Sequence, residues 1–282
     1  MSIELCILAS GSSGNCSVLR TPTGVMLIDA GIGPRVVPGR LRGTGVSVTD
    51  VSAVCLTHLD RDHFSPTWIN TLVKNKVAVY CHADRVAALL AYDGGDRLAG
   101  LVRPFESDPF EPLPGLVARP IPLAHDAEGS HGFVLDGFGC RVGYATDLGH
   151  VPEHLIAGFE SLDLLAIESN YDPQMQRESS RPWFLKQRIM GGRGHLSNEQ
   201  ALAAVRSVLD RSEASAVRLP SHIVLLHRSR QCNCPNLVRR LFTNDPRLAP
   251  RLVLSEQFTR TDWLRPNGGV PLAGEQLVLA WG

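Results

Sequence analysis

Residues 57–63 read Thr-His-Leu-Asp-Arg-Asp-His and directly follow an apolar, strand-like run. If the segment stays extended, alternation places His58, Asp60 and Asp62 on one side, and a tight turn then brings His63 round to them. Imidazole and carboxylate groups suit zinc, iron or manganese. A polar loop that ends a strand is the alternative interpretation. Four such groups would repel one another or need partners unless a cation lay among them, so the segment predicts a metal site.

Three further potential ligands also follow apolar runs. His125 comes after one strand-like segment, Asp147 after the next, and His227 after a third. A lone histidine in such a place is more often an ordinary turn or core residue. In α/β sheets, however, ligand sites gather at the carboxyl ends of strands. We therefore expect these three side chains to converge on the first cluster.

The order of short strands and helices indicates an α/β fold of two packed halves. Strands are predicted at residues 4–8, 17–19, 25–28, 51–56 and 77–81, and then at 116–123, 131–135, 140–145, 162–167 and 223–226. Helices are predicted at residues 65–74, 84–91 and 198–209, the last opened by a capping box of Ser197 and Gln200. Asp136-Gly137 signals a hairpin, and residues 35–45 should hold a helix by position although Pro38 opposes it. The tail, residues 252–282, matches no motif, although residues 276–280 resemble a strand.

Length and composition limit the class of protein. The chain has 282 residues without a linker, so we predict a single domain over residues 1–282. Its 28 basic and 28 acidic residues cancel, which argues against bulk electrostatic capture of nucleic acid but leaves room for a local patch. No long apolar run or basic leader is visible, so neither a membrane span nor a signal peptide is expected. Seven scattered cysteines favour a reducing cytoplasm, and Cys232-Asn233-Cys234 alone is weak evidence for zinc.

The segment at residues 58–63 resembles the His-x-His-x-Asp-His signature of the metallo-β-lactamase superfamily, and Asp29 matches that superfamily's first motif. The YycJ/WalJ-like branch is matched by SGSSGN at residues 10–15, TDLG at 146–149, ESN at 168–170, LKQRI at 185–189 and GHLSN at 194–198. The resemblance covers residues 5–235. It implies an α/β (α+β) class with a four-layer αββα fold and a dinuclear metal centre in a shallow groove.

The resemblance also implies roles for individual residues. One metal would be held by His58, Asp60, His125 and Asp147. The other would be held by Asp62, His63, Asp147 and His227, with a hydroxide that bridges the metals as nucleophile. Asp29 would orient ligands, and the predicted catalytic residues are Asp62, Asp147 and His195. The predicted substrate contacts are Ser12, Asn15, Asn170, Tyr171, Arg188 and Arg230.

Two positions depart from the pattern of the family. Asp60 stands where the signature has histidine, so two divalent cations and three carboxylates leave a net charge of +1 instead of +2. The harder oxygen ligand shifts the preference of the first site from zinc toward manganese or iron, or leaves that site weak. Tyr171 stands where the branch usually has histidine, and it can donate one hydrogen bond.

A basic segment with two aromatic residues is the best local candidate for contact with a polyanion. It contains Arg177, Arg181, Lys186, Arg188 and Arg193, with Trp183 and Phe184 among them. A solvated helix face is an equally valid interpretation. His195 lies just before the predicted helix start at Ser197, where it could either contact a phosphate or pack as part of the cap. The histidines without a predicted role are His82, His131, His150, His154 and His222, of which His150 is a rival acid/base group.

Three functions are consistent with these observations. The first is a metal-dependent hydrolase of phosphodiesters, such as a DNA exonuclease, with two zinc, manganese or iron ions; its nuclease part comes from the resemblance alone. In that case His195, His227 or Arg230 would neutralise or protonate the leaving group. The second is a hydrolase of a small ester, lactone, thioester or β-lactam. The third is an iron-based redox or binding protein. The sequence contains no signal for an oligomeric state.

Overall fold

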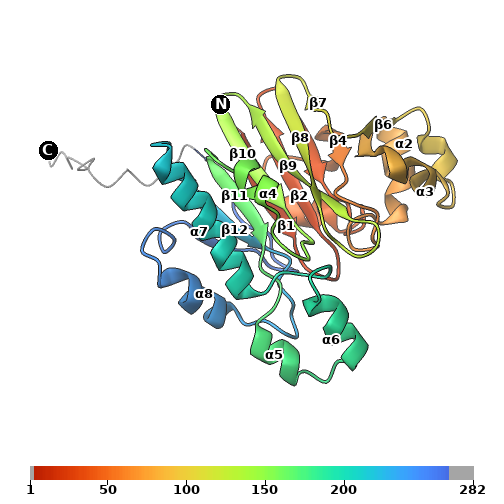
Figure 1. Cartoon of the computed structure of the whole chain (residues 1–282). Coiled ribbons are helices and arrows are strands. Elements are labelled where there is room, and N and C mark those ends of the chain that lie inside the picture. The colour runs from red at the N-terminus through yellow and green to blue at the C-terminus, as the bar shows by residue number, and fades with distance from the viewer. Residues whose placement is uncertain (1–2, 267–282) are drawn as a thin grey trace, which may run out of the picture.

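The computed structural model describes residues 3–266 and contains two β-sheets packed face to face between layers of helices (Figure 1). The first sheet has the order β1-β2-β3-β4-β5-β6. Its strands are β1 (Glu4–Ala9), β2 (Cys16–Thr21), β3 (Gly24–Ile28), β4 (Val51–Cys55), β5 (Ala78–His82) and β6 (Val102–Phe105). The helices of this half are α1 (Val37–Leu41), α2 (Ile69–Asn75) and α3 (Val86–Leu90).

The second sheet repeats this plan and runs β13-β12-β11-β10-β9-β8-β7. Its strands are β7 (Phe110–Leu113), β8 (Leu116–Leu123), β9 (Ser130–Gly137), β10 (Cys140–Ala145), β11 (Leu164–Glu168), β12 (His222–Leu226) and β13 (Leu252–Leu254). Its helices are α4 (Glu153–Gly158), α5 (Pro173–Glu178), α6 (Trp183–Met190), α7 (Asn198–Ala214) and α8 (Pro235–Thr243). In each sheet, antiparallel hairpins lead into parallel strands.

Alternate residues along the inner strands enter different apolar layers. Ile28 packs into the core between the two sheets, whereas its neighbour Leu27 packs against the helices that cover the first sheet. A third buried cluster joins the outer face of the second sheet to helices such as α7, where Val205 and Leu209 are fully buried. Strands covered on both faces read as continuous apolar runs. The four-layer αββα prediction is confirmed.

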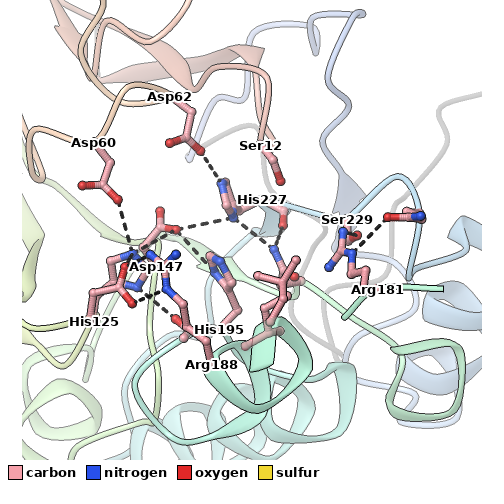
Figure 2. Close-up of a pocket in the computed structure, with 16 residues that line it drawn as sticks. Ser12, Asp60, Asp62, His125, Asp147, Arg181, Arg188, His195, His227 and Ser229 are labelled. Carbon is pink, nitrogen blue, oxygen red and sulfur yellow. Dashed lines mark hydrogen bonds and ion pairs between the residues drawn. The ribbon is translucent and has the colours of Figure 1, made fainter. Parts of the chain in front are cut away.

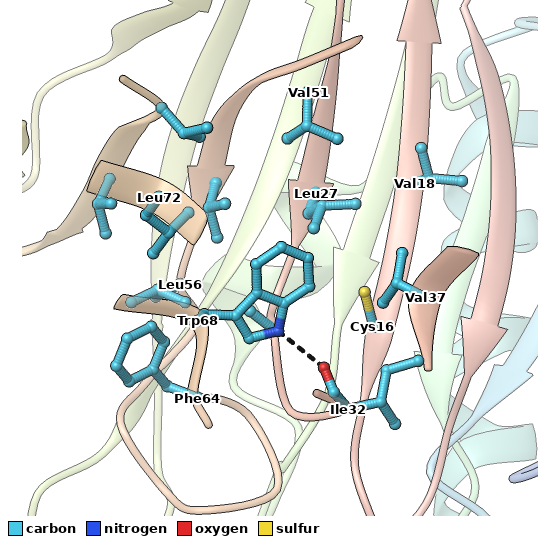
Figure 3. Close-up of a cluster of buried hydrophobic side chains, with 14 of the residues drawn as sticks. Cys16, Val18, Leu27, Ile32, Val37, Val51, Leu56, Phe64, Trp68 and Leu72 are labelled. Atoms are coloured by element: carbon cyan, nitrogen blue, oxygen red, sulfur yellow. Dashed lines mark hydrogen bonds between the residues drawn. The ribbon is translucent and has the colours of Figure 1, made fainter. Parts of the chain in front are cut away.

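Trp68 anchors the helical layer over the first sheet (Figure 3). Its side chain is buried, and its Nε1 donates a hydrogen bond of 2.7 Å to the carbonyl of Ile32. We expect Trp68→Phe to lower the free energy of unfolding by about 1–3 kcal/mol, because that carbonyl would stay buried without its donor. Chemical denaturation with a matched substitution at the exposed Val36 as the control measures the change. An unchanged midpoint would contradict the assignment of this bond.

Several local predictions hold, and several need correction. The capping box of Ser197 and Gln200 opens α7, with bonds of 2.8 and 3.2 Å between each side chain and the other residue's backbone nitrogen. The hairpin turn consists of Phe138-Gly139 and not of Asp136-Gly137, because Gly137 pairs with Cys140 and both turn residues have positive φ. The helix expected at residues 35–45 is only the short α1. Ser65 makes no side-chain cap at the start of its helix.

All seven cysteines are free. Between residues 3 and 266, no helix combines the length and the apolar character that crossing a membrane requires. The strand predicted at residues 276–280 lies outside the described residues.

Candidate metal centre

The predicted ligands from both halves of the chain meet at the carboxyl ends of strands (Figure 2). His58 follows β4, His125 follows β8, Asp147 follows β10 and His227 follows β12. Two sheets that face each other bring these ends together, which explains why residues so distant in sequence are neighbours. A cavity of about 470 Å³ opens over the cluster.

The first group of ligand atoms comes from His58, Asp60 and His125. Asp60 Oδ2 lies 3.8 Å from His58 Nε2 and 3.9 Å from His125 Nε2. His58 Nε2 is buried without a hydrogen-bond partner, whereas His125 Nδ1 donates to the carbonyl of Gly194 at 2.9 Å. An unpartnered imidazole nitrogen that faces a carboxylate and a second histidine fits a bound cation.

The second group comes from Asp62, His63 and His227. Asp62 Oδ2 lies 3.2 Å from His227 Nε2 and 3.8 Å from His63 Nε2. Asp147 lies between the two groups. Its Oδ2 is 2.9 Å from His63 Nε2, and its Oδ1 is 3.5 Å from His227 Nδ1 and 4.0 Å from His125 Nε2. One carboxylate therefore reaches both groups.

Asp29 holds His63 from the side away from the cavity. Its fully buried carboxylate accepts a hydrogen bond of 2.7 Å from His63 Nδ1, and it also accepts from the backbone nitrogen and the hydroxyl of Thr57. Burial raises the pKa of Asp29 against the lowering effect of His63. These bonds fix the ring of His63 so that Nε2 faces Asp147.

Three of these residues have left-handed backbones. The φ angles are 61° at Asp29, 57° at Asp147 and 51° at His227, each directly after or within two residues of a strand end. This conformation costs about 1–2 kcal/mol for a residue with a side chain. Such strained conformations cluster at functional sites. Here they occur where the chain leaves a strand, at two residues that face the common centre and at Asp29, which contacts His63 from behind.

The charges of the cluster suit divalent cations. Burial opposes the charged form of Asp147, but His227 and His63 outweigh it and hold the pKa of Asp147 well below its usual value. Burial also opposes the charged form of His227, yet Asp147 and Asp62 raise its pKa to about 10. Burial together with His63 lowers the pKa of His58 to about 3. A cation bound here would displace the proton of His227, and ionised carboxylates beside deprotonated imidazole nitrogens form the donor set that zinc, manganese and iron prefer.

Glu168 is the residue that sequence reasoning missed as a functional group. It is the last residue of β11 and is fully buried; its Oε1 lies 2.7 Å from His195 Nδ1 and 3.2 Å from His227 Nδ1. Its Oε2 accepts hydrogen bonds from the backbone nitrogens of Leu148 and Leu196. The sequence contained a signal for Glu168, because this acidic residue ends a strand. The two neighbouring strands, β10 and β12, are each followed by a predicted ligand.

Three predicted substrate contacts line the cavity, namely Ser12, Asn170 and Arg188. His195 lines it too, with its side chain one-fifth exposed. Arg188 forms an ion pair with Asp126. Asn170 Nδ2 donates a hydrogen bond of 2.6 Å to the carbonyl of His227 and lies 3.1 Å from His227 Nδ1. Arg181, which the sequence assigned only to the basic segment, also lines the cavity and donates to Ser229.

The structure places the other three predicted contacts elsewhere. Tyr171 packs into a buried cluster with Ile189. Arg230 lies outside this cavity because its guanidinium stacks over Phe258 at 4.8 Å. Asn15 is buried beneath the ligands: its backbone nitrogen donates to the carbonyl of Asp62 at 2.6 Å, and its Nδ2 lies 2.9 Å from His63 Nε2.

The backbone around Asn15 is closely packed. Gly31 donates a hydrogen bond to the carbonyl of Asn15, and a Cβ on Gly31 would lie 1.8 Å from the carbonyl oxygen of Asp62. Any side chain at position 31 would displace the segment that contains the ligands. The rival acid/base residue His150 is exposed, contacts the carbonyl of Gly192 and does not line the cavity.

Comparison with known proteins agrees with this geometry. The chain is 25% identical over 244 residues to Exodeoxyribonuclease YycJ of Bacillus anthracis, covering 85% of this chain and 87% of that protein. It is 28% identical over 244 residues to Exodeoxyribonuclease WalJ of Streptococcus pneumoniae serotype 2, covering 84% and 86%. Its fold matches the crystal structure of the metallo-β-lactamase fold protein YhfI from Bacillus subtilis with a TM-score of 0.65 at 14% identity, over 93% of this chain and 99% of that one. The family model described as Beta-lactamase superfamily domain matches residues 25–223, and the chain therefore belongs to this family, as its resemblance predicted.

Proposed function

We propose that the chain is a metal-dependent phosphodiesterase that acts on DNA as an exonuclease, with residues 1–282 working as a single domain. The observation that carries the proposal is the pair of His/Asp groups joined by Asp147 at the floor of a cavity that Arg181 and Arg188 also line. Carboxylates and guanidinium groups that line the same cavity suit a phosphate held between cations and arginines. The names of the two bacterial relatives support the choice of DNA.

Two divalent cations fit the donor atoms. One would be held by His58, Asp60 and His125, the other by Asp62, His63 and His227, and Asp147 would be shared. Bound there, the cations would neutralise the phosphate and lower the pKa of water to make it a nucleophile. The buried, unpartnered Nε2 of His58 supports this fit.

The chain's own residues then orient the substrate and move a proton. Arg188 and Arg181, which both line the cavity, would contact phosphate oxygens. Glu168 accepts a hydrogen bond from His195 Nδ1 and so favours the imidazolium, in which both ring nitrogens carry a proton. In that form Nε2 gives its proton to the leaving oxygen, and the neutral ring then takes up a proton from solvent. The same carboxylate contacts His227 Nδ1, so it fixes two rings of the site at once.

The metal content depends on Asp60. Its side chain is about half exposed and nearly 4 Å from both histidines of its group, so we propose a weak first site or one filled by manganese or iron. We expect Asp60→His to raise the zinc retained after dialysis toward two ions per chain. Elemental analysis of protein from an unsupplemented culture measures it. Two tightly held zinc ions in the unsubstituted protein would contradict the proposal.

The proposed activity is tested with manganese and a labelled DNA strand. We expect stepwise release of nucleotides and a substrate affinity that falls steeply as salt rises, because phosphates bound by arginines displace counterions. Turnover of a neutral ester or β-lactam that is indifferent to salt, without cleavage of DNA, would overturn the proposal. The proposal would also be overturned if protein purified without oxygen showed the optical spectrum of an iron centre and cleaved no DNA.

A further inference from the structure

The most exposed large apolar side chains of residues 3–266 lie beside the candidate metal centre. Trp183 is 72% exposed and Phe184 is 73% exposed, and they are consecutive residues at the start of α6. Helix α6 packs on the body of the protein through Leu185 and Ile189, which contact a buried cluster near Tyr171. Two large rings left in water beside a packed face indicate that something else covers them.

The helix that carries these rings also lines the cavity. Leu185, Arg188 and Ile189 of the same helix line it, and Phe184 lies four residues before Arg188 and so shares its face of the helix. Helices α5 and α6 lie together at one end of the molecule, away from helices α2 and α3 (Figure 1). A chain that leaves the cavity along α6 would therefore meet the two rings.

The charges around the two rings indicate which kind of molecule covers them. The basic residues of the segment are Arg177, Arg181, Lys186, Arg188 and Arg193, and within the described part of the chain only Arg188 has a carboxylate partner. Lys186 donates to the carbonyl of Arg177, and Arg181 donates to neutral groups such as Gln231, so their charges are not cancelled. Two copies of this face would repel each other, which disfavours self-association through it. Aromatic rings among unneutralised cations are the surface that an unpaired nucleic-acid strand requires.

We propose that Trp183 and Phe184 form a platform on which the bases of an unpaired strand stack while the phosphate of its terminal nucleotide lies in the cavity. This inference rests on the proposed function and adds the form of the substrate. Every base has an aromatic face, so the platform selects unpaired strands without selecting their sequence. A blunt duplex must fray before its bases can reach the rings.

Binding is measured separately from cleavage, by fluorescence anisotropy in the presence of a chelator, with labelled oligothymidylate and a blunt duplex of equal length. We expect Trp183→Ala with Phe184→Ala to weaken binding of the single strand at least about tenfold, since each stacked base contributes about fivefold or more. The duplex should bind less well and be less affected. Trp183→Tyr with Phe184→Tyr should restore binding, and the exposed apolar Val36→Ala is the matched control.

Three outcomes would overturn the platform. These are unchanged affinity in the double alanine variant, an equal loss for the duplex, and a dimer of the unsubstituted protein that this variant dissociates in size-exclusion chromatography. Single-strand binding that depends on both rings, in a protein that cleaves no DNA when manganese is restored, would support the platform and count against the proposed function. Cleavage of DNA, together with single-strand binding that is unchanged in the double alanine variant, would support the proposed function and overturn the platform.

Discussion

Asp147→Ala is expected to abolish cleavage of DNA, with a fall of more than about 100-fold in kcat. Partners that only orient a metal ligand cost 10- to 100-fold when they are removed, and Asp147 is proposed to be a ligand that both cations share. Its carboxylate lies 2.9 Å from His63 and 3.5 Å from His227. The substitution would also remove one of the two carboxylates that contact both buried rings and leave only that of Asp62. Metal content should fall together with activity.

The matched control is Asp84→Ala. Asp84 also pairs with a histidine, His82, at 3.5 Å, but its side chain is 83% exposed and it does not line the cavity. Asp147→Asn provides a second variant that keeps the size of the side chain. Cleavage at the unsubstituted rate in either Asp147 variant, with its fold verified by circular dichroism, would refute a shared carboxylate ligand.

His195→Gln is expected to lower kcat by about 10²- to 10⁴-fold, the usual contribution of a positioned general acid. Metal content should stay unchanged, because His195 lies outside the two groups proposed to hold the cations. The loss should be small for an aryl phosphodiester, whose leaving group departs without a proton. Glu168→Gln should show the same dependence on the leaving group in weaker form, since it orients His195, and it should also lower metal content, because the same carboxylate contacts the proposed ligand His227.

His150→Gln is the control for this second experiment, because His150 is exposed and directed at the carbonyl of Gly192. Near-normal cleavage is expected. A large loss of kcat in His150→Gln with little change in His195→Gln would show that His150, and not His195, is the general acid. An equal loss in His195→Gln for good and poor leaving groups would exclude the acid role.

Sequence reasoning located most of the cluster because the relevant signals are local. Each of His58, His125, Asp147 and His227 stands just after an apolar run, and the topology of parallel strands carries such positions to one edge. The central residues of most predicted strands and helices could be located in the same way, because their signals are also local. Their ends were less predictable, as the turn at Phe138-Gly139 illustrates.

The missed features depend on contacts between distant parts of the chain. Glu168 ends a buried strand, which was a signal for it, but its contact with His195 depends on the segment before α7 that places the ring against it. Arg230 was assigned to the substrate, but stacking on Phe258 from the C-terminal segment holds it elsewhere. Helix α6 has a weak apolar pattern since it buries Ile189 and exposes Trp183 and Phe184.

The ligand cluster straddles the boundary between the two sheets, with His58, Asp60, Asp62 and His63 on one side and His125, Asp147 and His227 on the other. Cations in such a place would act as a removable cross-link between the halves of the molecule. At a free concentration of 100 times the dissociation constant, one bound ion adds about 2.7 kcal/mol to folding. The thermal resistance of this protein would then report the metal supply of its surroundings.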